Sequence, residues 1–294
     1  MEKLKIVFIV NPKSGTKNKE GLPALIDAIL DKERFEPTII FTQYAGHGRE
    51  LAARLVKEKY EYIIACGGDG TMNEVASELV HTDSVFGIIP YGSGNGLARH
   101  LSIPMSPKKA LQQINNHTIK LMDYGLAGET KFFCTCGAGF DANISHKFAT
   151  QGKRGFLTYL KTTVKEYFNY KPCIYVLKND EIEITQQAFL VTFANASQYG
   201  NNAFIAPRAS TSDGLLDVCI LKPFSLFYVP WLASLLFLRK IDKSKHITIV
   251  RAKEITLTRK NAGAFHLDGD PVEKEKEVRV KVVAAGLKVL VGKV

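Results

Sequence analysis

The sequence predicts an α/β domain with a mostly parallel sheet over residues 1–122 and a mainly antiparallel, sandwich-like β domain over residues 123–283. The first observation is the length, since 294 residues suit two domains of the usual ~100–200 residues. Second, the first part alternates short β-type runs with helical periodicity, which is typical of βαβ units. Third, many short β-type runs follow residue 123, as in a sandwich.

The first domain is expected to contain four strands and five helices. Each expected strand leads directly into a turn that contains Gly, Asn or Pro. In a parallel sheet such turns lie together at the carboxyl ends of the strands, where ligands bind. The expected strands are 4–10, 37–42, 61–66 and 85–90, and the expected helices lie near 20–32, 46–59, 71–80, 94–101 and 106–116.

The second domain is expected to be built mostly from short antiparallel strands, interrupted by helical stretches at 153–169 and 224–240. No internal repeat or low-complexity tract is visible in it. The expected β segments are 131–139, 173–178, 187–195, 215–221, 246–258, 263–268 and 277–283.

The composition, with 46% hydrophobic and 23% charged residues, is that of an ordinary globular protein and excludes disordered, collagen-like and polytopic membrane classes. The N-terminal run at 6–12 ends in a turn, so no signal peptide is expected. Five cysteines without a CxxC pair favour reduced thiols in a cytoplasmic protein. The charge-free run 223–238 is shorter than the ~20 residues that a spanning helix needs.

The net charge of +10 lies mostly in the second domain. Residues 123–294 contain 24 basic and 16 acidic side chains, against 15 and 13 in residues 1–122. The basic excess is concentrated in 147–171 and 239–260. It favours an anionic partner, either nucleic acid or an acidic membrane surface, although scattered solvated lysines give the same count. No RNP-like strand or helix-turn-helix pattern supports nucleic acid.

A glycine-rich turn follows the expected strand that ends at Cys66 and leads directly into a helix. Glycine lets the backbone approach a phosphate closely, and the helix N-terminus offers unpaired N–H groups and a positive dipole end. The aspartate in this turn could hold Mg²⁺ on a nucleotide's phosphates, and a plain structural turn is the alternative. The candidate phosphate-binding residues of this turn are Gly67, Gly68, Asp69, Gly70 and Thr71, and the helix begins at Met72 and Asn73.

Two further polar turns follow strands of the same sheet, at 11–15 and at 92–96. Together with the first turn they describe a cradle for a polyphosphate. The chain has no GxxxxGK[ST] pattern, so a P-loop is excluded. The candidate nucleotide contacts in these two turns are Asn11, Ser14, Ser93, Gly94 and Asn95.

These motifs resemble those of the diacylglycerol kinase, sphingosine kinase and bacterial lipid kinase family. The resemblance implies a Rossmann-like nucleotide domain of the NAD kinase/diacylglycerol kinase type, to which 284–294 returns. It also implies transfer of the γ-phosphoryl group of Mg-ATP to the hydroxyl of a membrane lipid, diacylglycerol-like or sphingoid. The matching segments are GGDGT at 67–71, NPKSG at 11–15, GSGNGLARHL at 92–101, Thr42 with Gly46-His47, and FIAPRASTSDGLLDVCI at 204–220.

The resemblance also assigns roles to single residues. The positions of Thr42, 67–73 and Ser93 contact ATP in relatives, with Asp69 as the essential motif aspartate. Asp123 matches a second acidic residue of the metal-linked site. A structural Mg²⁺ site of bacterial relatives matches the Asp213 carboxylate, with backbone oxygens of Ser210 and Leu215 as co-ligands.

The family's acceptor-activating carboxylate lies in an Asp-Gly-Glu motif, which here reads Asp268-Gly269-Asp270. Asp270 is the expected base for the lipid hydroxyl, although Asp is one methylene shorter than Glu. Glu273 and a plain turn before Pro271 are the alternatives. Further departures from the family pattern are Gly96 and Tyr199-Gly200-Asn201-Asn202, and the candidate cations for the phosphates are Lys13, Arg99 and Arg208.

Two apolar segments next to basic residues suggest peripheral contact with a membrane. Residues 153–170 have an amphipathic helical pattern with lysines on a neighbouring face. The apolar segment 223–238 is followed directly by Arg239 and Lys240, so that 223–240 joins apolar and basic residues. Core packing is the alternative for both. The rival functions are an NAD kinase-like enzyme and a non-catalytic nucleotide- or membrane-binding relative. The particular lipid and the oligomeric state, a homodimer included, stay open.

Overall fold

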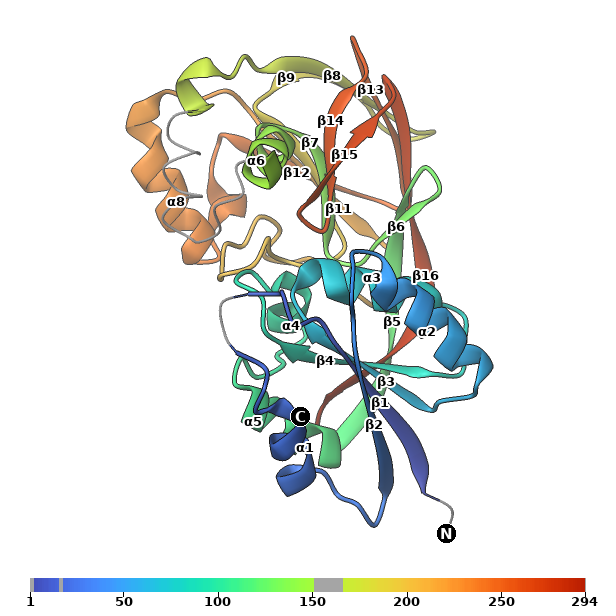
Figure 1. Cartoon of the computed structure of the whole chain (residues 1–294). Helices are drawn as coiled ribbons and strands as arrows, with labels where there is room; N and C mark the ends of the chain where they lie inside the picture. The colour runs from blue at the N-terminus through green and yellow to red at the C-terminus, as the bar shows by residue number, and fades with distance from the viewer. Residues whose placement is uncertain (1–2, 16–17, 151–165, 294) are drawn as a thin grey trace. The chain divides into compact units, whose positions relative to one another are not determined.

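The computed structural model describes residues 3–15, 18–150 and 166–293 (Figure 1). The chain divides into two compact units. Unit 1 consists of Met1–Asp123 and Ala285–Val294, and unit 2 consists of Tyr124–Ala284. Unit 1 is an α/β domain and unit 2 is mainly an antiparallel sandwich, so the predicted fold class is confirmed.

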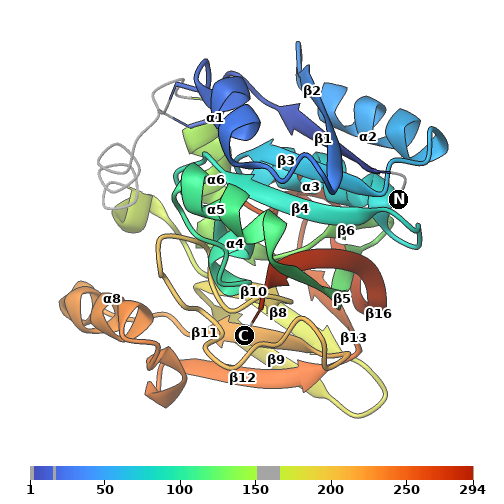
Figure 2. The same ribbon diagram turned by 90° about the horizontal axis from the view of Figure 1, so that it is seen from below.

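The sheet of unit 1 has the parallel order β2-β1-β3-β4, continued by the end of β16. All residues of β3 and β4 are buried, which is typical of central strands covered on both faces. Figure 2 shows β1, β3 and β4 side by side. The strands are β1 (Leu4–Val10), β2 (Phe35–Phe41), β3 (Tyr62–Gly67), β4 (Val85–Pro90) and β16 (Glu277–Gly292).

The helices of unit 1 form two contacting pairs, α1 with α5 and α2 with α3. α1, α2 and α3 each follow a strand and return the chain for the next parallel strand, as βαβ connections require, whereas α4 and α5 follow one another between β4 and β5 (His117–Ala127). Pro23 is the second residue of α1 and Pro107 is the first residue of α5, and in the first turn the missing N–H of proline costs no helical hydrogen bond. The helices are α1 (Leu22–Ile29), α2 (His47–Lys57), α3 (Asp69–Leu79), α4 (Gly96–His100) and α5 (Pro107–Asn115).

Unit 2 contains one antiparallel sheet in the order β12-β11-β10-β7-β14-β15, and a second set of antiparallel pairs that includes β16-β13-β8-β9 and β5-β6. Its elements are β5 (His117–Ala127), β6 (Thr130–Phe132), β7 (Thr135–Gly139), α6 (Phe140–Thr150), β8 (Cys173–Lys178), β9 (Glu183–Ala188), β10 (Leu190–Ala194), β11 (Leu216–Leu221), η1 (Leu226–Tyr228), α8 (Val229–Phe237), η2 (Ile241–Lys243), β12 (Ile247–Ala252), β13 (Glu254–Arg259), β14 (Gly263–Leu267) and β15 (Asp270–Lys274).

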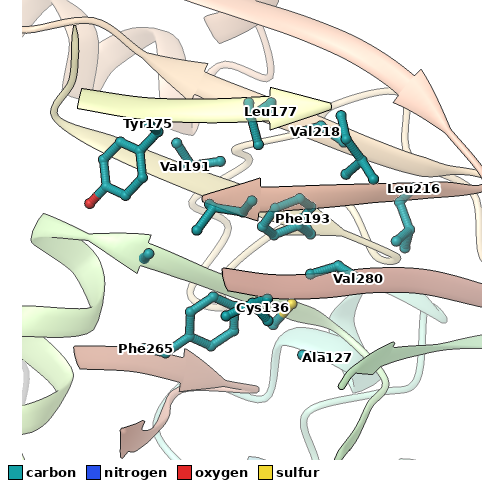
Figure 3. Close-up of a cluster of buried hydrophobic side chains, with 14 of the residues drawn as sticks. Ala127, Cys136, Tyr175, Leu177, Val191, Phe193, Leu216, Val218, Phe265 and Val280 are labelled. Atoms are coloured by element: carbon teal, nitrogen blue, oxygen red, sulfur yellow. The ribbon is translucent and has the colours of Figure 1, made fainter. Parts of the chain in front are cut away.

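The core of unit 2 lies between these two sets of strands (Figure 3). Phe193 and Phe265 come from the first sheet, and Leu177, Leu257 and Val280 come from the second set. All five side chains are almost completely buried. The alternation along each strand therefore supplies both inner faces of a sandwich.

Several predicted elements differ from the observed ones. The segments 131–139, 187–195 and 246–258 each form two strands, because within each segment the chain passes from one sheet to the other. The segment 224–240 forms η1 and α8 and stops before Arg239. The predictions missed β5, α6 and β15, and most of the predicted helix at 153–169 lies outside the described residues.

Two strands belong to both units. β5 starts in unit 1 and ends in unit 2, and β16 does the reverse. β16 pairs with β13 along its first part, while Val289 pairs with Phe86 of β4. The last ten residues of the chain therefore belong to unit 1.

Candidate functional site

The three polar turns of unit 1 lie side by side at the carboxyl ends of β1, β3 and β4. The N–H groups of Tyr91 and Gly92 both donate to the carbonyl of Gly67, at 2.8 and 3.1 Å. The Asn11 side-chain amide donates to Thr71 Oγ1 at 3.0 Å, and the Asn11 N–H donates to the carbonyl of Cys66 at 3.0 Å. These bonds join each turn to its neighbour.

The close approach of the turns depends on glycine. A Cβ atom on Gly15 would lie 1.8 Å from the carbonyl oxygen of Tyr91, and its φ of +62° also favours glycine. A Cβ atom on Gly92 would lie 2.6 Å from the Cα of Gly68. Any larger residue at Gly15 or Gly92 would therefore push the turns apart.

Asp69 joins the turn after β3 to the turn after β4. Its two carboxylate oxygens accept the N–H groups of Asn95 and Gly96, each at 2.8 Å. Asn95 has a φ of 51°, in the left-handed region that Asn tolerates better than most residues. Arg99 braces the same turn, because its Nε donates to the carbonyl of Gly94 at 3.0 Å. Asp69 thus has a structural function, and its predicted metal contact is additional to it.

The N-terminus of α3 points its first N–H groups at this junction of turns. Asp69, Gly70 and Thr71 begin the helix, and the first helical bond runs from the Met72 N–H to the Gly68 carbonyl at 3.0 Å. The N–H groups ahead of it have no partner within the helix, and the helix dipole adds positive potential there. A phosphate group suits such a position.

The other predicted nucleotide residues also lie at this edge of the sheet. Thr42 follows β2, and its N–H donates to the carbonyl of Val10 at 2.9 Å. Ser14 is buried and donates from Oγ to the carbonyl of Asn11 at 3.0 Å. Ser93 is exposed, whereas Gly94 and Asn73 are half-buried. Nucleotide contact by these residues stays a prediction.

Two residues that the sequence analysis did not select support these turns. Lys19 is buried, its ammonium donates to the carbonyl of Ser14, and it lies 5.0 Å from the ring centre of Tyr91. Burial lowers the pKa of Lys19. Glu74 accepts the N–H groups of Gly46 and Gly48 at 2.9 and 3.1 Å, which holds the start of α2. Neither residue belongs to a recognisable motif, so nothing in the sequence distinguishes Lys19 or Glu74 from other charged residues of the chain.

Asp123 lies at the point where β5 and β16 pass from one unit to the other. It is 2% exposed, and its Oδ1 accepts the N–H of Ala285 at 2.7 Å. Ala285 has a φ of 52°, so this bond helps to hold a strained bend in β16. The predicted metal-linked function of Asp123 stays a prediction.

In unit 2, the two aspartates of the 268–270 motif have different surroundings. The Asp268 carboxylate accepts the N–H groups of Phe133, Cys134 and Thr135 at 2.9, 2.7 and 3.1 Å. These three bonds fix the turn between β14 and β15, at whose end Asp270 is exposed. Asp268 is therefore a positioning residue for the turn that presents Asp270.

The alternative base, Glu273, has a partner of its own. Its Oε1 lies 3.3 Å from His146 Nε2, on α6. The Glu273 side chain is 67% exposed and the His146 side chain is 41% exposed.

The predicted structural cation site lies in the loop before β11. One oxygen of Asp213 accepts the Leu215 N–H at 3.1 Å, and the other lies 2.8 Å from the Arg251 guanidinium. Arg251 also donates to the Asp217 carboxylate at 2.8 Å. The loop therefore already has a cation next to Asp213, and the donor set around Asp213 fits a guanidinium better than Mg²⁺. Metal binding by Ser210, Asp213 and Leu215 stays a prediction.

Arg208, a predicted phosphate-binding cation, is also in unit 2. Its Nε lies 3.0 Å from the Asp242 carboxylate. Lys13 is exposed in unit 1, and its backbone N–H donates to the Asn11 side chain at 3.0 Å. The phosphate contacts of Lys13, Arg99 and Arg208 stay predictions.

Unit 2 has an apolar cavity of about 180 Å³ next to α8. Its walls come from α6, β10, β11, α8, η2 and the loops next to them. Tyr199 lines it as well, and the Tyr199 hydroxyl lies 3.0 Å from Asp141 Oδ2. The lining side chains are Phe140, Phe189, Leu190, Tyr199, Ile205, Leu221, Phe224, Val229, Leu232, Ala233, Leu236 and Ile241.

A polar cluster adjoins Tyr199, and no local pattern in the sequence indicates it. Asp141 Oδ2 also accepts from Thr192 Oγ1 at 3.0 Å and lies 3.1 Å from His266 Nε2. Burial, and then the Asp141 charge, raise the pKa of Tyr199, so its hydroxyl stays protonated. The four residues come from α6, β10, a loop and β14, so only the folded chain assembles the cluster.

Within the described part of the chain, no group of three or more His, Cys, Asp or Glu side chains is arranged to hold a metal ion. None of the helices described has the length and apolarity needed to cross a bilayer.

Comparison with known proteins finds two matching family models. Residues 5–127 match the diacylglycerol kinase catalytic domain, and residues 134–291 match the YegS C-terminal NAD kinase beta sandwich-like domain.

Related proteins match over nearly the whole chain. A diacylglycerol kinase of Mycobacterium tuberculosis (strain CDC 1551 / Oshkosh) is 28% identical, covering 97% of this chain and 94% of its own. A diacylglycerol kinase of Bacillus subtilis (strain 168) is 26% identical, covering 92% and 90%. A crystal structure of a diacylglycerol kinase from Bacillus anthracis str. Sterne has the same fold, with a TM-score of 0.75, 19% identity, and coverage of 99% and 98%.

Proposed function

Because the chain belongs to the family of lipid kinases that combine a diacylglycerol kinase catalytic domain with a YegS-type β-sandwich domain, we propose that it transfers the γ-phosphoryl group of ATP to a membrane-lipid hydroxyl. One observation supports the proposed binding of ATP by unit 1. Three glycine-bearing turns are joined by hydrogen bonds at the N-terminus of α3, with Asp69 between two of them. Backbone N–H groups held in place in this way suit a polyphosphate.

In the proposed reaction, the residues of unit 1 bind and orient ATP. The glycines let the phosphates approach the backbone, and the start of α3 supplies N–H donors. Mg²⁺, when bound, neutralises negative charge on the phosphates. Asp69 would hold it, because a carboxylate oxygen is a ligand that Mg²⁺ prefers and Asp69 begins α3 next to the proposed phosphate site. Asp123 would act in the same metal-linked site.

In unit 2, Asp270 would accept the proton of the lipid hydroxyl as the hydroxyl oxygen attacks the γ-phosphorus. The three N–H bonds to Asp268 would keep the turn in a single conformation. The apolar cavity next to α8 supports a lipid acceptor, since its aliphatic and aromatic walls suit an acyl chain. The same walls offer little to a dinucleotide such as NAD, which is the rival acceptor.

The test uses purified protein with labelled Mg-ATP and one acceptor at a time. The acceptors are diacylglycerol, a sphingoid base, ceramide, phosphatidylglycerol and NAD, with the lipids in detergent micelles. We expect label in at least one lipid, and none with Asp69→Asn. Label in NAD alone would identify an NAD kinase-like enzyme. No label in any acceptor, despite ATP binding, would identify a non-catalytic relative.

A further inference from the structure

The segment 226–238, formed by η1, α8 and Leu238, exposes large apolar side chains. Phe227 is 92% exposed, Leu238 is 62% exposed and Phe237 is 51% exposed. Of the twelve large apolar side chains that are exposed in the described part of the chain, six lie in this segment, so they form one concentrated surface. The six are Leu226, Phe227, Tyr228, Trp231, Phe237 and Leu238.

The opposite side of α8 already has a packing partner. Leu232 is 4% exposed and lines the apolar cavity together with Val229 and Leu236. Packing within unit 2 therefore explains why the side chains on this side of α8 are apolar. It does not explain why the side chains on the exposed side are apolar as well. Exposed apolar surface of this kind usually marks a contact with another molecule or a membrane.

Basic residues lie at both ends of the exposed surface. At one end, the rings of Tyr228 and Trp231 lie 4.8 and 6.4 Å from the His246 ring, and the Lys222 N–H donates to the His246 carbonyl at 2.8 Å. Lys245 directly precedes His246, so two lysines belong to this end. At the other end, α8 is followed by Arg239 and Lys240, and Lys240 is exposed.

Almost no negative charge offsets these cations. Asp242 is the only acidic residue between positions 222 and 246. Its carboxylate lies 3.0 Å from Arg208, which compensates it. The surface is therefore apolar in the middle and basic at its ends, which excludes a basic partner and complements an anionic one.

We propose that the segment 226–238 docks on the surface of an anionic lipid bilayer, with Phe227, Trp231 and Leu238 entering the acyl region. Tyr and Trp rings are favoured at the boundary between headgroups and acyl chains. The flanking lysines attract anionic headgroups, each with about 1 kcal/mol of favourable energy near the surface. This inference goes beyond the proposed function, because docking requires no phosphoryl transfer.

Trp231 is the only tryptophan in the chain and lies within the proposed surface, so its fluorescence reports docking directly. The unmodified protein is titrated, without nucleotide, with vesicles of phosphatidylcholine or of equimolar phosphatidylcholine and phosphatidylglycerol. We expect a blue shift and stronger emission with the anionic vesicles, and weaker binding as the salt concentration rises. An unchanged spectrum with both vesicles would overturn the proposal, as would equal binding to both.

Matched variants identify the surface. Phe227→Ser should weaken binding to anionic vesicles about tenfold or more, because it removes a large apolar side chain from the bilayer. Ile174→Ser is the control, since Ile174 is 61% exposed in the same unit but lies on β8. The double variant Lys240→Glu and Lys245→Glu should reduce the salt dependence, while Lys276→Glu should not. Equal loss in the test and control variants would overturn the proposal.

A second copy of the chain is the competing occupant. If Trp231 shifts to the blue without vesicles as the protein concentration rises, and Phe227→Ser abolishes the shift, the surface is a dimer interface and the proposal is wrong. Failure of docking leaves the proposed function untouched, because the kinase assay uses lipids in micelles. Failure of the kinase assay likewise leaves the vesicle titration interpretable.

Discussion

At the residue scale, Asp268 and Asp270 show how two aspartates separated by one glycine can have different functions. Asp268 accepts three backbone N–H groups and lies in the left-handed region, with a φ of 50°. Asp270 lies one residue beyond Gly269, at the start of β15, and its side chain is exposed. A carboxylate that holds a turn suits positioning, whereas an exposed carboxylate at the end of that turn suits proton transfer.

We expect Asp270→Asn to lower kcat for the lipid substrate about 100-fold or more, because the amide cannot accept the hydroxyl proton. The affinity for ATP, measured by calorimetry, should stay unchanged, since the predicted nucleotide contacts lie in unit 1. Glu273→Gln is the matched control and should retain activity. If Asp270→Asn keeps full activity and Glu273→Gln loses activity, Glu273 is the base for the lipid hydroxyl and the prediction for Asp270 is wrong.

The buried His117 predicts a dependence of stability on pH. Its Nδ1 lies 2.6 Å from the Ile114 carbonyl oxygen and its Nε2 lies 3.1 Å from the Tyr62 hydroxyl. Burial lowers the pKa of His117 below its ordinary value of 6.5. As the pH falls below 6.5, the unfolded chain binds a proton before the folded one does, so the free energy of unfolding falls.

We expect this histidine to contribute at most about 1.4 kcal/mol per pH unit to the loss of stability. Urea unfolding of the unmodified protein and of His117→Gln, at pH values of about 7.5 and 5.5, gives the change in the free energy of unfolding between the two pH values. The Gln variant should lose less stability on acidification, because it has no proton to bind. Equal losses in the two proteins would contradict the assignment.

At the element scale, the site of unit 1 depends on the contact between three turns and on the start of α3. The N–H groups of Tyr91 and Gly92 share the Gly67 carbonyl, and Asp69 links the β3 turn to the β4 turn. No single turn contains all the residues predicted to contact the nucleotide, so the proposed site requires the three turns to be held together.

Gly92→Ala tests this contact. The new Cβ would lie 2.6 Å from the Gly68 Cα and 2.7 Å from Asn95 Oδ1, so the two turns have to separate. We expect the affinity for ATP to fall about tenfold or more, since overpacking typically costs about 1–3 kcal/mol. Gly21→Ala is the control, because a Cβ there meets no atom within 4 Å. Calorimetric affinities that are equal for the two variants would contradict the argument.

At the scale of the whole molecule, the C-terminal residues complete the N-terminal unit. Leu287 and Val289 of β16 are completely buried, and Val289 pairs with Phe86 of β4. Asp123 and Ala285 form the bond at the bend through which the chain re-enters unit 1. The stability of the nucleotide unit therefore depends on residues more than 180 positions away from its central strands.

Leu287→Ala should lower the free energy of unfolding of unit 1 by about 2–5 kcal/mol, the range for a fully buried leucine. Calorimetry in the presence and absence of Mg-ATP identifies the relevant transition, since a bound nucleotide raises the unfolding temperature of the unit that binds it. Lys293→Ala, at an exposed position, is the control. If Leu287→Ala instead destabilises the transition that Mg-ATP does not shift, the assignment of Leu287 to the core of unit 1 is wrong.

The sequence by itself determined the fold class and the position of the glycine turns, because period-two and helical patterns and the glycine spacing are local properties. It also carried the family resemblance. It did not reveal β5, α6, β15 or the cluster of Asp141, Thr192, Tyr199 and His266. Only the tertiary structure decided these features, because they depend on residues that lie far apart in the chain.

The same reason applies to the charged residues. The side chains of Asp69, Asp123, Asp213 and Asp268 are chemically identical carboxylates, and folding gives each a different partner. Segment 223–238 is apolar throughout by sequence, yet only folding buries Leu232 and exposes Phe227. Burial and hydrogen bonding are non-local, so the sequence named the candidate residues and the tertiary structure decided what each of them contacts.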